Sequence, residues 1–158
     1  MTRHAVVTRG HGGAIVTAEA GDDGGQIITA IERFPYEAGP VVDRALHLKA
    51  DDPTCSIVVD VEGLGDAVWE LLARPRRRHG WLLYAKHGLE REELTRTLLV
   101  AVERNSFRFA PGLADEDAMK RALVGLTRNV REEGPGSELA VALSLALDDH
   151  RPPTPRIG

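Results

Sequence analysis

The first 34 residues constrain the fold most strongly, because three strand-like runs follow one another with only short turns between them. The runs cover residues 4–8, 14–19 and 26–34 and are rich in valine, isoleucine and threonine. The turns at residues 10–13 and 22–25 are rich in glycine. A parallel crossover needs about a dozen residues or more, so turns this short predict an antiparallel meander of three strands.

Beyond the meander, helix-like spacing of apolar residues alternates with short apolar runs. The run at residues 56–61 is almost continuously apolar, which is typical of a strand that is covered on both faces. Alternating strands and helices after a meander predict an α/β domain, in which helices pack on a mixed sheet. We expect further strands at 56–61, 81–85 and 107–109, and helices at 40–50, 63–73, 90–104, 114–129 and 137–147.

Length and composition predict one domain in the cytoplasm. The chain has 158 residues, of which 42% are hydrophobic, and this suits a single buried core. We expect the domain to span residues 1–150 and a flexible, proline-rich tail to cover 151–158. No apolar run approaches the roughly 20 residues that cross a bilayer, the start lacks a signal-peptide pattern, and Cys55 is the only cysteine. A cytoplasmic protein without a membrane partner is therefore expected.

A formal net charge of −4 gives the chain no general electrostatic attraction to nucleic acid. A contact with DNA would need a local basic patch, and the candidates are Arg76, Arg77 and Arg78. We expect these residues in a loop between a helix and a strand, where they are candidate ligands for nucleic-acid phosphates. A solvated loop without a ligand is the alternative interpretation.

Two acidic residues are candidates for a functional site. Asp60 follows the apolar residues 57–59, where burial of a carboxylate is costly without a partner, and ligands often bind at the carboxyl ends of such strands. The alternative is that Asp60 caps the following loop or helix. Glu138 begins the apolar helix expected at 137–147, and the alternative there is ordinary pairing with the helix dipole.

These two segments resemble the nuclease domain of phage large terminase subunits. Residues 57–72, IVVDVEGLGDAVWELL, are similar to its strand–turn–helix, and residues 136–147, GSELAVALSLAL, are similar to its last helix. The resemblance implies a ribonuclease-H-like fold and cleavage of DNA by two divalent metal ions held by carboxylates. It places the strand at 57–61 beside the strand at 5–8.

The resemblance also implies roles for single residues. Asp60 and Glu138 become the catalytic ligands of Mg²⁺ or Mn²⁺, and their side chains are expected to converge. Glu62 is a further candidate metal ligand, because it would share a strand face with Asp60. The family has an aspartate on the first strand, roughly where Thr8 falls, but this sequence has no acidic residue before Glu19.

The missing acid predicts that metal-dependent cleavage is weak or lost, because two-metal hydrolysis needs several carboxylates. The first hypothesis is therefore a terminase-like DNA endonuclease with an incomplete metal site. The alternative is an inactive module in a phage context, which binds nucleic acid or other terminase-like subunits.

Overall fold

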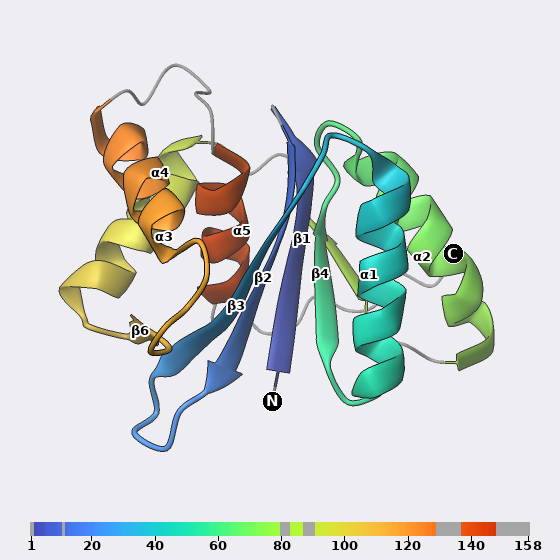
Figure 1. The fold of residues 1–158 in the computed structure, drawn as a ribbon, viewed down its shortest axis with the longest axis horizontal. Helices are drawn as coiled ribbons and strands as arrows, with labels where there is room; N and C mark the ends of the chain where they lie inside the picture. Colours follow the sequence, from blue (N-terminus) through green and yellow to red (C-terminus); the bar gives the residue numbers. More distant parts are fainter. Residues whose placement is uncertain (1, 11, 80–82, 87–90, 129–136, 148–158) are drawn as a thin grey trace.

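A six-stranded mixed sheet forms the centre of the protein (Figure 1). The structure, a computed structural model, describes residues 2–10, 12–79, 83–86, 91–128 and 137–147. The strand order across the sheet is β5-β4-β1-β2-β3-β6. The strands are β1 (Thr2–Arg9), β2 (Gly12–Ala20), β3 (Gln26–Phe34), β4 (Ser56–Asp60), β5 (Leu83–Lys86) and β6 (Phe107–Phe109).

The first three strands form the expected antiparallel meander, since β2 pairs antiparallel with both β1 and β3. The later strands join it in parallel: β4 pairs with β1, β5 with β4, and β6 with β3. The prediction that the strand around residues 57–61 lies beside the first strand is thus confirmed. Because β1 and β4 are parallel, their C-terminal ends meet at one side of the sheet, which we call the carboxyl edge.

Helices cover both faces of the sheet, as the predicted fold class requires (Figure 1). On one face lie α1 (Ala38–Asp51) and α2 (Gly65–His79). On the other face lie α3 (Arg91–Glu103), α4 (Glu116–Arg128) and α5 (Ser137–Leu147), with α5 directly on the strands. The parts of the predicted elements at residues 81–82, 90 and 129, and the predicted tail at 151–158, lie outside the described residues.

Side chains of the central strands alternate between two cores, as the two-residue period of a strand requires. Val7, Ala14 and Val58 pack in the core that contains α5. Their neighbours in sequence, which include Val6 and Val59, pack in the other core with α1 and α2. The period therefore assigns each residue near the carboxyl edge to one face, and Asp60 follows Val58 on the α5 face.

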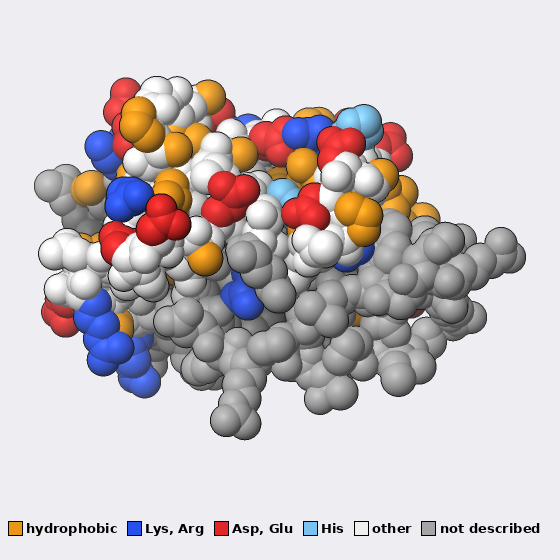
Figure 2. All heavy atoms as spheres, turned by 90° about the horizontal axis from the view of Figure 1, so that it is seen from below, with side chains coloured by type: hydrophobic (Ala, Val, Ile, Leu, Met, Phe, Trp, Pro, Cys, Tyr) orange, Lys and Arg blue, Asp and Glu red, His pale blue; other side chains and the backbone are white. Residues whose placement is uncertain are grey.

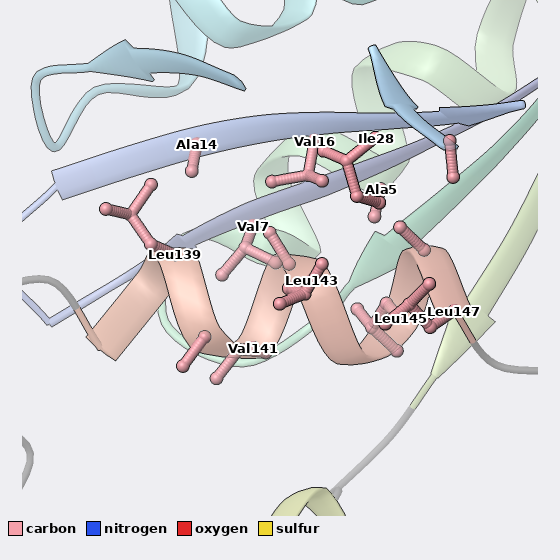
Figure 3. Packing of buried hydrophobic residues seen from close by; sticks show 14 of the residues in the cluster. Ala5, Val7, Ala14, Val16, Ile28, Leu139, Val141, Leu143, Leu145 and Leu147 are labelled. Atoms are coloured by element: carbon pink, nitrogen blue, oxygen red, sulfur yellow. The ribbon is translucent and has the colours of Figure 1, made fainter. Parts of the chain in front are cut away.

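Helix α5 is buried along almost its whole length, because its side chains are small and apolar. Leu143 extends from α5 toward the sheet near Val7 of β1, and both belong to the same core as Val16 of β2 (Figure 3). Leu139 and Leu147 are also buried in this core, one near each end of the helix. The packing holds the first turn of α5, which carries Glu138, firmly against the sheet.

One predicted boundary is wrong. The sequence predicted a helix that ends at Ala73 and a loop containing Arg76, Arg77 and Arg78, whereas α2 continues to His79. The basic residues were interpreted as a loop, but arginine is among the better helix formers. In the described part of the chain, no helix is both long and apolar enough to cross a lipid bilayer.

Candidate functional site

Asp60 is the last residue of β4, and its side chain is only 1% exposed. One carboxylate oxygen, Oδ1, accepts a hydrogen bond from the backbone N–H of Glu62 at 3.2 Å. The other, Oδ2, lies 3.6 Å from Nη1 of Arg9. Asp60 thus caps the turn that follows β4, as the alternative to a role in ligand binding predicted. It also forms a buried ion pair at the carboxyl edge.

The turn after Asp60 lies directly on the end of β1. The backbone N–H of Leu64 donates to the carbonyl of Thr8 at 3.0 Å. Gly63 has a φ of +60°, and a Cβ at this position would lie 2.5 Å from the Thr8 carbonyl oxygen and 3.0 Å from Cα of Arg9. Only glycine combines this conformation with so close an approach. The turn therefore fixes the backbone from which the Arg9 side chain extends.

Glu138 lies in the first turn of α5, and its side chain is 3% exposed. Its Oε1 lies 3.7 Å from Nη2 of Arg33, a β3 residue whose side chain is 47% exposed. A Cβ on Gly12 would lie 3.5 Å from the same oxygen, so the carboxylate rests against the β1–β2 hairpin. The other oxygen, Oε2, is buried and has no hydrogen-bond partner within the described residues.

Arg9 joins the two acids into one site. It pairs in register with Gly12, so its side chain projects on the face of the sheet where Gly12 meets Glu138. The side chain is 10% exposed and reaches Asp60 of the neighbouring strand. Asp60 and Glu138 therefore lie on the same face of the carboxyl edge. Arg9 lies on β1, between β4, which carries Asp60, and β2, which Glu138 meets at Gly12.

The prediction missed Arg9 because it examined Thr8 as the counterpart of the first-strand acid. The strand period places Thr8 with Val6, on the α1 face. A Cβ on Gly13 would lie 3.3 Å from the Thr8 methyl carbon and 3.0 Å from a methyl of Val41 in α1. Thr8 therefore faces away from Asp60. The sequence signal that could have found Arg9 was the two-residue period of the strand, which places Arg9 on the same face as Val7.

Glu62 does not share a strand face with Asp60, contrary to the prediction. The strand ends at Asp60, and Glu62 is an exposed residue of the following turn. The two-residue alternation stops there, because the Asp60 carboxylate turns the chain by binding the Glu62 amide. Among the residues that the structure describes, no three histidine, cysteine, aspartate or glutamate side chains are grouped so that they could hold a metal ion.

The residues of the site do not fit the divalent ions that the terminase resemblance implies. Two carboxylates, Asp60 and Glu138, each have a guanidinium at ion-pair distance, which is 3.6 Å for Arg9 and Asp60 and 3.7 Å for Arg33 and Glu138. Two like unit charges 4 Å apart near a protein surface repel by about 4 kcal/mol, and a divalent ion would double that repulsion from Arg9.

The basic stretch is separate from this site. Arg76 lies 11 residues after Gly65, the first residue of α2, or about 17 Å along the helix axis. Helix α2 also packs on the face of the sheet opposite α5. The side chains of Arg76, Arg77 and Arg78 lie outside the described part of the structure, so their role in binding nucleic acid stays a prediction.

Comparisons with known proteins identify the fold. No family model matches the sequence, and no curated protein matches it. Among solved structures, the Holliday junction resolvase of fowlpox virus has a TM-score of 0.56 at 12% identity, over 93% of this chain and 95% of that chain.

Two further resolvases are similar. Thermus thermophilus RuvC in complex with a Holliday junction substrate has a TM-score of 0.51 at 13% identity, over 93% of this chain and 91% of that chain. The yeast mitochondrial resolvase Ydc2 has a TM-score of 0.55 at 8% identity, over 92% of this chain and 77% of that chain. The chain therefore has the ribonuclease-H-like fold that these Holliday junction resolvases share.

Proposed function

We propose that this protein is a DNA-binding module with a nuclease fold that has lost metal-dependent cleavage. The observation that carries the proposal is the buried pair of Arg9 and Asp60 at the carboxyl edge. In a two-metal nuclease, carboxylates bind ions that activate water and stabilise the leaving oxygen. A guanidinium neutralises a carboxylate but cannot activate water in this way, because it offers no open coordination position.

The similar structures suggest which DNA the module binds. All three are Holliday junction resolvases, and the Thermus thermophilus protein holds a junction substrate. Branched DNA is therefore the proposed ligand. Arg33 is the half-exposed arginine of the site and a candidate phosphate contact, and Arg76–78 form a second candidate surface.

The surface charge favours local rather than general contacts with DNA. Figure 2 views the side opposite the carboxyl edge, and much of its described surface carries interspersed acidic and basic side chains. The net charge of −4 gives no general attraction to DNA, so we expect binding through a few arginines at the carboxyl edge. Such binding weakens as salt rises, because each neutralised phosphate releases counterions.

A terminase-like role is the second candidate. The observation in its favour is the resemblance of residues 57–72 and 136–147 to the terminase nuclease domain. In that case the partners would be linear duplex DNA and other subunits of a phage packaging complex. Preference for duplex over branched DNA distinguishes this candidate from the first.

The test is to measure binding and cleavage on the same DNA. A labelled four-way junction and a duplex of the same sequence are titrated with protein in EDTA, Mg²⁺ or Mn²⁺, and anisotropy and gel analysis report complex and product. We expect junction binding that is unchanged by EDTA, with no product. Cleavage that requires Mg²⁺ or Mn²⁺ and disappears in Asp60→Asn would overturn the proposal.

A matched pair of variants tests the site of binding. Arg33→Gln removes an arginine at the carboxyl edge, and Arg108→Gln removes one that pairs with Asp23 near the other end of β3. Both side chains are about half or more exposed, but only Arg33 pairs with a buried carboxylate, so thermal melts must first show that both variants are folded. We expect only Arg33→Gln to weaken junction binding. Equal loss in both variants would contradict binding at the carboxyl edge.

A further inference from the structure

We infer that the Arg9 guanidinium occupies the place of a divalent cation, and that position 9 decides whether the carboxyl edge can hold a metal ion. The inference deepens the proposed function and rests on it, because it explains how cleavage was lost. It concerns three residues that the structure brings to one face of the sheet: Arg9, Asp60 and Glu138.

The geometry assigns this role to Arg9 and not to its neighbour Thr8. Arg9 pairs with Asp60 and lies in register with Gly12, which meets Glu138 on the face of α5, whereas Thr8 lies on the face of α1. The Arg9 side chain is almost fully buried, and the close approach of Gly63 holds its backbone in place. It is therefore part of the site and not a surface arginine that reached an acid by chance.

The charges point to the same role. Asp60 and Glu138 are both buried, so each needs a positive partner. Arg9 forms an ion pair with Asp60, and Arg33 forms one with Glu138. The second oxygen of Glu138, Oε2, has no hydrogen bond to any described residue. Arg9→Asp would remove the positive charge beside Asp60 and add a third carboxylate. Three carboxylates, with water molecules as the remaining ligands, form a set of oxygen donors that binds Mg²⁺ and Mn²⁺.

The test compares Mn²⁺ binding by the unmodified protein and three variants, by electron paramagnetic resonance and calorimetry without DNA. The variants are Arg9→Asp, Thr8→Asp as the matched control on the opposite face, and Arg9→Asp combined with Asp60→Asn. We expect Arg9→Asp to bind one Mn²⁺ at least roughly ten-fold more tightly than the unmodified chain, because a repelling charge becomes a ligand. Thr8→Asp should match the unmodified chain, and the double variant should lose the gain.

Circular dichroism confirms that each variant is folded. If Arg9→Asp does not fold, Arg9→Ala replaces it, and Mn²⁺ should then raise its Tm more than that of the unmodified protein. The inference is overturned if neither Arg9 variant responds to Mn²⁺, if Thr8→Asp gains as much, or if the unmodified chain already binds Mn²⁺ through Asp60.

The metal measurement is independent of DNA, so the two proposals can fail separately. Metal binding by Arg9→Asp without any junction binding by the unmodified protein would overturn only the DNA-binding proposal. Junction binding by the unmodified protein without metal binding by either Arg9 variant would overturn only the role of Arg9.

Discussion

Replacing Gly63 with alanine should destabilise the protein through the contact that holds the candidate site together. Gly63 has a φ of +60°, and an added Cβ would lie 2.5 Å from the Thr8 carbonyl oxygen. The left-handed conformation costs an alanine about 1–2 kcal/mol. Moving two packed backbone segments apart costs about 1–3 kcal/mol more, so the expected loss is roughly 2–5 kcal/mol in all.

Gly24→Ala is the matched control, because Gly24 also has a positive φ, +83°, but no atom within 4 Å of an added Cβ. It should lose only the conformational part, about 1–2 kcal/mol. Urea unfolding followed by circular dichroism gives both free energies of unfolding. If Gly63→Ala loses no more than Gly24→Ala, the close packing of this turn on β1 is refuted.

Three further changes test the pair, the core and the pH dependence. Arg9→Met should cost about 3–5 kcal/mol in urea unfolding, because it removes the guanidinium that pairs with the buried Asp60 carboxylate. Arg9→Met combined with Asp60→Leu should cost less than the sum of the two single changes. Leu143→Ala should cost about 3–5 kcal/mol through a cavity, and Val102→Ala, 54% exposed, about 0.5 or less. Burial lowers the pKa of His4 below 6.5, so the unfolded state binds its proton first and stability falls as the pH drops below 6.5; His4→Gln should flatten this fall in thermal melts from pH 7 to 5.

Much of the fold could be predicted because hydrophobic period and turn length are local properties. Short glycine-rich turns allow only antiparallel neighbours, and this led correctly to the meander of β1, β2 and β3. The apolar run before Asp60 indicated a strand covered on both faces, as β4 is. The predicted end of α2 was wrong because the arginine-rich segment was interpreted as a loop, whereas it continues the helix to His79.

The candidate site could be predicted only in part. Asp60 and Glu138 stood out because an acid beside a long apolar run needs a partner, but the sequence does not show which partner the fold supplies. Arg9 comes from the last position of β1, where a shift of one residue decides the face. The position of Glu62 was predicted wrongly because the two-residue period of the strand was extended beyond Asp60, where β4 ends.

A crystal of the unmodified protein soaked in Mn²⁺ would test most directly whether arginine has replaced metal at the carboxyl edge. The anomalous signal of manganese reports where the ion binds, independently of activity or DNA. We expect no manganese peak between Asp60 and Glu138, and the Arg9 guanidinium at ion-pair distance from Asp60. A manganese ion bound by both carboxylates, with the Arg9 side chain turned away, would contradict it.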